Sequence, residues 1–130
     1  MLGREVLVVD DDEAIRLMLM EVLESSGYRV RTAANGREAL EEVERRPPAV
    51  VVLDAIMPEM DGPTFLKEQR RRPALPHVPT VVISAYPERA ETAMAELGVE
   101  AFLPKPFRLE ELVRLLEQVV SHAGDAEHRP

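Results

Sequence analysis

Short apolar runs alternate along the chain with segments whose apolar residues recur every three or four positions. The strands predicted from the runs are Val6–Val9, Val50–Leu53, Thr80–Ile83 and Ala101–Leu103. Nearly uninterrupted runs of this length are typical of strands that are covered on both faces. The pattern therefore predicts buried strands joined by helices, as in a parallel α/β sheet.

A fifth strand, predicted at Tyr28–Thr32, has a different pattern. Arg29 and Arg31 alternate there with less polar residues. Alternation is typical of a half-exposed strand, and charges on an edge strand discourage pairing with other molecules. This strand is therefore predicted to lie at the edge of the sheet.

Helices are predicted between the strands and after the last one, because apolar residues at helical spacing form one face of an amphipathic helix. The first follows a cap at Asp11 or Asp12 and ends at Gly27, and the second runs from about Gly36 to Arg46. The third begins at Pro63, the fourth runs from Pro87 to Gly98, and the last carries Leu109, Leu112, Val113 and Leu116. The periodicity is lost from Ser121 onward. Residues 1–120 are therefore predicted to form one domain and residues 121–130 a flexible tail or linker.

The alternation of strands and helices also predicts how the sheet is connected. Five strands alternating with five helices indicate a doubly wound, five-stranded parallel sheet of the α/β class. Right-handed crossovers and an edge position for the second strand favour the strand order 2-1-3-4-5. In that order the first and third strands are neighbours, so their carboxyl ends meet.

Polar residues follow the buried strands. Asp10 and Asp11 follow the first strand, Asp54 the third and Ser84 the fourth, and Lys105 follows the fifth after Pro104. Open parallel sheets place their functional sites at the carboxyl ends of the strands. We therefore expect three acids, a hydroxyl and an ammonium group to meet at one rim of the sheet.

This set of groups is suited to handling a phosphoryl group. Carboxylates held together raise one another's pKa unless a cation neutralises them. A donor set made only of oxygen favours a hard divalent cation, Mg²⁺ with Mn²⁺ as a substitute. A carboxylate can attack phosphorus and hold the phosphoryl group as an acyl phosphate, with a cation and a hydrogen-bond donor beside it. Taken singly, Asp10 would be read as part of a helix cap, Ser84 as a strand-end hydroxyl and Lys105 as surface charge, but the combination favours a phosphoryl site.

Composition excludes several other classes of protein. The 130 residues carry a formal net charge of −8, which argues against direct binding of nucleic acid. The absence of cysteine excludes disulfides and thiolate metal sites. No apolar stretch approaches the roughly 18 residues of a membrane span, and the first residues lack a secretory apolar region. No membrane insertion and a cytoplasmic location are therefore expected.

In their order along the chain, these motifs resemble the receiver domain of two-component response regulators of the chemotaxis-regulator type. The resemblance extends from about Val6 to Val120 and rests on Asp10-Asp11, the segment Asp54–Gly62, Ser84-Ala85 and Lys105-Pro106-Phe107. It implies a flavodoxin-like fold and a phosphoacceptor role for Asp54, with Lys105 and Ser84 contacting the phosphoryl group. A receiver is a regulatory domain that promotes only its own phosphotransfer and dephosphorylation.

The resemblance also implies the surroundings of the acceptor. Asp10, Asp11, Asp54 and the main-chain carbonyl of Ile56 are expected to hold Mg²⁺, Asp10 through water. Ile56, Ala85 and Tyr86 are expected at the rim of the phosphoryl pocket, where the bulk of Ile56 and Tyr86 would slow the attack of water and lengthen the life of the phosphoform. The Lys105–Pro106 peptide bond is expected to be cis, a state essentially confined to bonds before proline.

Signalling by such a domain implies a switch and partners. Ser84 and Phe102 are the expected switch residues, which reshape the face formed by the fourth helix, the fifth strand and the fifth helix. A sensor histidine kinase or a histidine phosphotransfer protein is the expected phosphodonor, and the reshaped face is expected to bind a downstream protein or a second copy of the domain.

Two alternative functions remain open at this stage. Asp10 and Asp12 superficially match the Asp-x-Asp motif of haloacid-dehalogenase-type hydrolases, in which Asp10 would be the nucleophile. Ala14 departs from the Thr or Val usual after that motif, and the chain has little room for a substrate cap. The other alternative is an interaction module that keeps the fold without phosphorylation, which the complete set of site residues disfavours.

Overall fold

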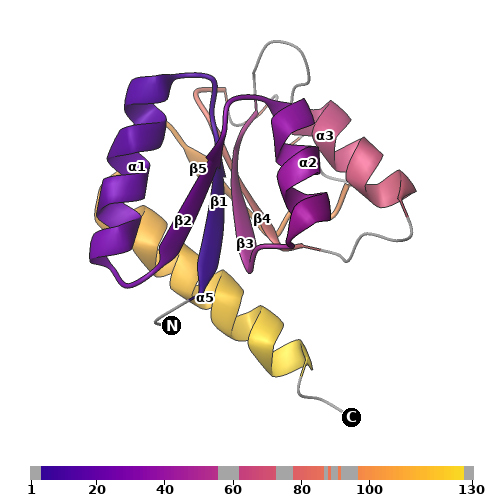
Figure 1. Ribbon diagram of the computed structural model, residues 1–130. Helices are drawn as coiled ribbons and strands as arrows, with labels where there is room; N and C mark the ends of the chain where they lie inside the picture. The colour runs from indigo at the N-terminus through magenta and orange to yellow at the C-terminus, as the bar shows by residue number, and fades with distance from the viewer. Residues whose placement is uncertain are drawn as a thin grey trace.

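In the computed structural model, five parallel strands form one sheet in the order β2-β1-β3-β4-β5 (Figure 1). The strands are β1 (Glu5–Val9), β2 (Arg29–Ala33), β3 (Val50–Asp54), β4 (Thr80–Ser84) and β5 (Ala101–Pro104). The structure describes residues 4–55, 62–72, 78–86, 88, 91 and 97–127, the last six of these as backbone only. The predicted strand order and the doubly wound α/β class are confirmed, and β2 is an edge strand as its charges indicated.

The described helices pack on both faces of the sheet (Figure 1). They are α1 (Glu13–Ser25), α2 (Gly36–Arg45), α3 (Gly62–Arg71) and α5 (Leu109–Glu127). On one face, α2 and α3 bury Val43 and Phe65 against Leu7 and Val51. On the other face, α1 and α5 bury side chains against the alternate residues of the same strands. This division explains why the central strands are apolar at every position, since each successive side chain enters the opposite core.

Most of the helix predicted from Pro87 to Gly98 lies outside the described residues. Its predicted last residue, Gly98, is described and has a φ angle of +74°, the left-handed conformation that commonly follows a helix. Gly27 after α1 has a φ of +98° and ends that helix as predicted. The segment between α3 and β4 is described only at its two ends, residue 72 and residues 78–79.

Two helix ends refine the sequence-based boundaries. Asp12 is the N-cap of α1, because its side chain accepts hydrogen bonds from the amides of Ala14 and Ile15 at 2.9 and 3.3 Å. At the other end of the chain, α5 continues to Glu127, past the point where apolar periodicity stops. The helix therefore ends later than predicted. None of the described helices is long and apolar enough to cross a membrane.

Candidate functional site

The register of the sheet brings the predicted site residues together. Val9 of β1 pairs with Leu53 of β3, so Asp10 and Asp54, the next residue on each strand, end side by side. Asp54 pairs with Ile83, which precedes Ser84. Ser84 in turn pairs with Pro104, and the amide of Lys105 donates to the Ser84 carbonyl oxygen at 2.8 Å. Backbone pairing between neighbouring strands therefore brings the site residues to the same edge of the sheet.

Three carboxylates converge at this rim. One carboxylate oxygen from each of Asp10, Asp11 and Asp54 lies within 4.8 Å of the other two. Asp10 is buried, Asp54 is half-buried and Asp11 is exposed, so the cluster opens to solvent on one side. An oxygen-only donor set with this much negative charge is suited to a hard divalent cation such as Mg²⁺. The predicted fourth ligand, the carbonyl of Ile56, lies outside the described residues.

Asp10 occupies the least favourable position for a charge. Its pKa is raised from the ordinary 3.8 to about 6, chiefly because the group is buried; the hydrogen bond from the Asp12 amide at 2.9 Å opposes this rise and the charge of Asp54 adds to it. Its backbone is held on both sides, since its amide donates to Ala33 and its carbonyl oxygen accepts from Arg16 Nη1 at 2.7 Å. The hydrophobic pattern did not single out Arg16, because a charged residue is not part of the apolar face of α1.

Lys105 is the basic group nearest to the expected acceptor among the contacts that the structure describes. Its Nζ lies 4.0 Å from Asp54 Oδ2, at the edge of ion-pair distance. The Lys105 side chain is 28% exposed and that of Asp54 is 12% exposed, so the pair is partly screened by water. The peptide bond between Lys105 and Pro106 is cis. Lys105 therefore lies beside the acid cluster.

Ser84 is buried, and its hydroxyl already has one partner. Its Oγ accepts a hydrogen bond from the Tyr86 amide at 2.9 Å, which is the strand-end arrangement considered from the sequence. A serine hydroxyl has two acceptor lone pairs and one proton, so accepting from Tyr86 leaves the proton available for donation. Both interpretations of Ser84 are therefore compatible with this geometry.

The remaining predicted residues that the structure describes lie on β5 and directly after β4. Phe102 is partly buried and packs against the core formed with α2 and α3. Ala85 is exposed, and Tyr86 is 54% exposed, one of the large hydrophobic side chains that the described surface presents to solvent. These two residues follow Ser84 directly in the chain, and their place at the rim of a phosphoryl pocket stays a prediction.

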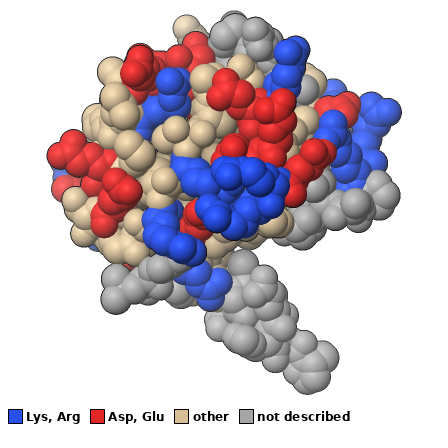
Figure 2. All heavy atoms as spheres, viewed as in Figure 1, with Lys and Arg blue, Asp and Glu red and all other residues tan. Residues whose placement is uncertain are grey.

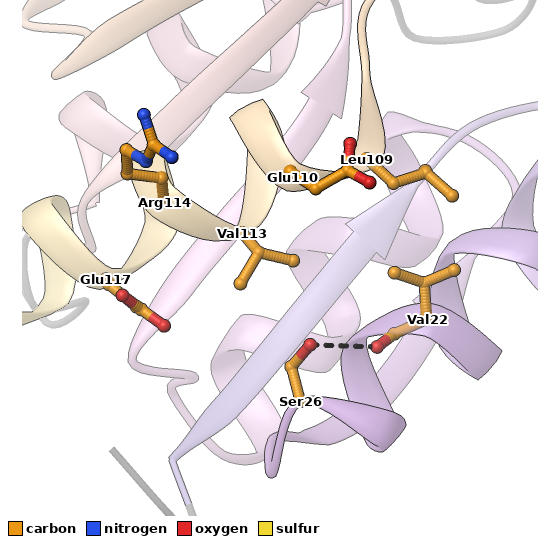
Figure 3. Close-up of a pocket in the computed structure, with 7 residues that line it drawn as sticks. All are labelled: Val22, Ser26, Leu109, Glu110, Val113, Arg114 and Glu117. Carbon is orange, nitrogen blue, oxygen red and sulfur yellow. Dashed lines mark hydrogen bonds between the residues drawn. The ribbon is translucent and has the colours of Figure 1, made fainter.

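A groove lies elsewhere on the molecule, between α1 and α5 (Figure 3). It has a volume of about 440 Å³ and is lined by Val22, Ser26, Leu109, Glu110, Val113, Arg114 and Glu117. Val22 and Val113 face each other across it, and Ser26 donates to the Val22 carbonyl oxygen at 3.2 Å. None of the predicted site residues lines this groove.

Comparison with known proteins gives one family. The sequence model of the response regulator receiver domain matches residues 6–117. The chain is 36% identical over 120 residues to the chemotaxis protein CheY of Thermotoga maritima, which covers 91% of this chain and 98% of that protein. The chemotaxis response regulator CheY4 of Vibrio cholerae has a similar structure, with a TM-score of 0.82, 34% identity, and 90% of this chain and 98% of that chain covered.

Longer proteins contain a similar segment. The chain is 41% identical over 121 residues to the sensor kinase CckA of Brucella abortus, covering 88% of this chain and 12% of that protein. It is 37% identical over 118 residues to the DNA-binding transcriptional regulator NtrC of Escherichia coli, covering 90% of this chain and 25% of that protein. The chain therefore spans only a small part of these relatives.

Proposed function

Because this chain belongs to the family of response regulator receiver domains, we propose that it is a phosphorylation-dependent signalling switch with Asp54 as the phosphoacceptor. Receiver domains are regulatory components of two-component signal transduction, and the assignment of individual residues is our inference. The convergence of Asp10, Asp11 and Asp54 beside Lys105 is the observation that carries it.

Asp54 is the carboxylate best placed to accept the group. It ends the central strand β3 and has Lys105 on one side and the other two acids on the other. In the transfer, a carboxylate oxygen of Asp54 forms a bond to phosphorus while the bond from phosphorus to the donor's imidazole nitrogen breaks. The nitrogen leaves with the bonding electron pair, and Asp54 becomes an acyl phosphate.

The other residues stabilise this change in charge. Asp10 and Asp11, with Asp54, would hold Mg²⁺, which when bound neutralises negative charge on the phosphoryl oxygens. Lys105 places an ammonium group where it can pair with one of those oxygens. Ser84 can donate its hydroxyl proton to another while it continues to accept from the Tyr86 amide.

The output follows from the position of Phe102. A shift of Ser84 toward a phosphoryl oxygen would loosen the end of β4, and Phe102 of β5, which is only partly buried, pairs with Val82 two residues before Ser84. We propose that Phe102 repacks inward and reshapes the output face predicted from the sequence, of which the structure describes β5 and α5. A downstream protein or a second copy would bind there, and a histidine kinase or histidine phosphotransfer protein would supply the phosphoryl group. Receiver-like segments in a sensor kinase and in a transcriptional regulator are compatible with several outputs.

Labelling identifies the acceptor. We expect ³²P from acetyl phosphate, with Mg²⁺ present, to enter the wild-type protein as an alkali-labile acyl phosphate and to be absent from Asp54→Asn. Asp12→Asn is the matched control, because Asp12 is the neighbouring acid that caps α1 instead of joining the cluster. Label that survives in Asp54→Asn but is lost in Asp10→Asn would contradict the proposal and support the hydrolase alternative. An unlabelled wild-type protein would support the module without phosphorylation.

A further inference from the structure

Arginine side chains gather on a surface remote from the acid cluster, over β2 and the C-terminal end of α2 (Figure 2). Five residues form what we call the arginine patch: Arg4 before β1, Arg29 and Arg31 on β2, and Arg45 and Arg46 at the end of α2. The patch is unexpected on a chain whose formal net charge is −8. Figure 2 shows it as a blue area bordered by acidic side chains over α2.

Two glutamates hold the patch together from beneath. Glu5 accepts hydrogen bonds from Arg46 Nε and Nη2 at 3.2 and 2.9 Å, one on each carboxylate oxygen, and forms an ion pair with Arg31 at 3.1 Å. Glu42 contacts Arg31 and Arg45 at 2.9 and 2.7 Å. The hydrogen bond with Arg45, followed by that with Arg31, lowers the pKa of Glu42 from its ordinary value, so Glu42 stays ionised at neutral pH.

The exposed layer of this network is cationic. The side chains of Arg45 and Arg46 are 62% and 58% exposed, whereas those of Glu5 and Glu42 are 10% and 24% exposed. Three guanidinium groups therefore share two carboxylates, and those of Arg45 and Arg46 are the exposed ones, since Arg31 is only 11% exposed. Arg4 and Arg29 are also exposed, and the Arg29 amide donates to the Arg4 carbonyl oxygen at 2.9 Å, so they adjoin the network.

From this arrangement we propose that the arginine patch is a docking surface for an acidic segment of a partner protein. A guanidinium group binds a carboxylate through two parallel hydrogen bonds, which a lysine ammonium cannot do. The contacts with Glu5 and Glu42 hold Arg31, Arg45 and Arg46 in place before binding, so less side-chain entropy is lost when a partner binds.

The border of the patch distinguishes an acidic segment from a nucleic acid. Glu38, Glu41 and Glu44 are exposed on α2 beside it. A long polyanion gains affinity by neutralising many phosphates in succession, and here it would soon meet this acidic border. A short acidic run flanked by basic residues matches the charges better, because its centre meets arginines and its flanks meet glutamates.

The surface is separate from the phosphorylation site. None of its residues belongs to the acid cluster, and it lies at the opposite, amino-terminal end of the β1 strand, where Glu5 and Arg4 begin the sheet. The proposal therefore does not depend on the proposed function, and the binding experiment below is carried out on the unphosphorylated chain.

Two fluorescent peptides of the same composition test the proposal. One has a central run of glutamates flanked by lysines, and the other has a central run of lysines flanked by glutamates. In fluorescence anisotropy at about 20 mM salt, where surface charges are weakly screened, we expect the glutamate-centred peptide to bind about tenfold tighter than the permuted one. Binding should weaken steeply by about 300 mM salt.

A matched pair of variants localises the binding. Arg29→Gln with Arg45→Gln should weaken binding of the glutamate-centred peptide about tenfold. Arg71→Gln with Arg114→Gln removes the same charge from exposed positions on α3 and α5 and should change it by less than about twofold. Equal effects of the two double variants, equal binding of the two peptides, or tighter binding of an oligouridylate RNA than of the glutamate-centred peptide would each overturn the proposal. Circular dichroism of both double variants shows that they are folded.

Discussion

Lys105 Nζ lies 4.0 Å from Asp54 Oδ2, close enough to stabilise negative charge but too far for a tight ion pair. Lys105→Gln removes the positive charge and keeps most of the side-chain length. Since removal of one preorganised electrostatic contact slows a reaction by about 10²-fold, we expect phosphorylation of Asp54 by acetyl phosphate to slow by roughly that factor.

Lys67→Gln is the matched control for this experiment. Lys67 is the other lysine of the chain and is exposed on α3. The variant has the same net charge as Lys105→Gln, and its phosphorylation rate should equal that of the wild type. A similar loss of rate in both variants would show that Lys105 acts only through the overall charge.

The raised pKa of Asp10 predicts that, in the absence of divalent cations, the free energy of unfolding depends on pH. Its folded-state pKa is about 6 against an ordinary 3.8, so between these values the folded protein binds more protons than the unfolded one. The free energy of unfolding should therefore fall as pH rises from about 4 to about 6, and the loss should persist above that range. Asp10→Asn should remove it and stabilise the cation-free protein at pH 7.5 by on the order of 2 kcal/mol.

Urea denaturation in EDTA at pH 4.5 and pH 7.5 measures this effect. The variant and the wild type should differ mainly at the higher pH. Added Mg²⁺ should stabilise the wild type more than Asp10→Asn, because the variant lacks one carboxylate of the expected site. An equal difference at the two pH values would contradict the assignment of the shift to Asp10.

The backbone of the site was predictable from the sequence, whereas its side-chain contacts were not. Apolar runs and an edge strand at Arg29 and Arg31 indicated the strand order, and the order implied that Asp10 and Asp54 would be neighbours. The bond from the Tyr86 amide to Ser84 depends on the direction of one hydroxyl, which no hydrophobic pattern encodes. The hydrogen bond from Arg16 to the Asp10 carbonyl oxygen depends on the backbone conformation of the short segment between β1 and α1.

The side-chain contacts of the arginines on β2 could not be predicted from the hydrophobic pattern either. Their alternation on β2 indicated an exposed edge, but Arg31 is 11% exposed and is held by Glu5 and Glu42. Charged residues at alternating positions of an edge strand are usually solvated. Arg31 can be buried because two glutamates, Glu5 on β1 and Glu42 on α2, lie close enough to pair with it. Such pairings join residues far apart in sequence, so the hydrophobic periodicity does not record them.

The shared carboxylate of Glu5 is expected to stabilise the fold. Glu5→Gln leaves Arg31, which is nearly buried, with one fewer anion, and breaking a buried ion pair costs more than breaking an exposed one. We expect a loss of about 2 kcal/mol in the free energy of unfolding. Glu68→Gln, which breaks the exposed pair with Arg71 on α3, should cost less than about 0.5 kcal/mol. If Glu5→Gln and Glu68→Gln lost equal free energy of unfolding in urea denaturation, burial of the Glu5 ion pairs would contribute nothing to stability.

Gly98 and Gly27 both adopt a positive φ angle, but only Gly98 has a side chain, that of Arg70, close to its Cα. Both have positive φ angles, so alanine should cost about 1 kcal/mol at either position. Only at Gly98 would the added Cβ approach Arg70 Nη2, at 2.5 Å, and displace it from its hydrogen bonds to the Leu97 and Gly98 carbonyl oxygens. Gly98→Ala should therefore destabilise the protein by about 1 kcal/mol more than Gly27→Ala. In an Arg70→Ala background that difference should disappear, and its persistence would rule out the contact as the cause.

The half-exposed ring of Tyr86 predicts a slow loss of the phosphoryl group. The Tyr86 amide donates to Ser84 Oγ and the Tyr86 side chain is 54% exposed, and we propose that this bulky group stands where water would approach the acyl phosphate. We expect the ³²P-labelled wild type to remain labelled for minutes after removal of acetyl phosphate, and Tyr86→Ala to lose label about fivefold faster because water is less well excluded. Leu17→Ala, which removes a similarly exposed apolar side chain from α1, should leave the rate unchanged. Complete loss of label from the wild type within seconds would contradict this prediction, as would equal rates in wild type and Tyr86→Ala.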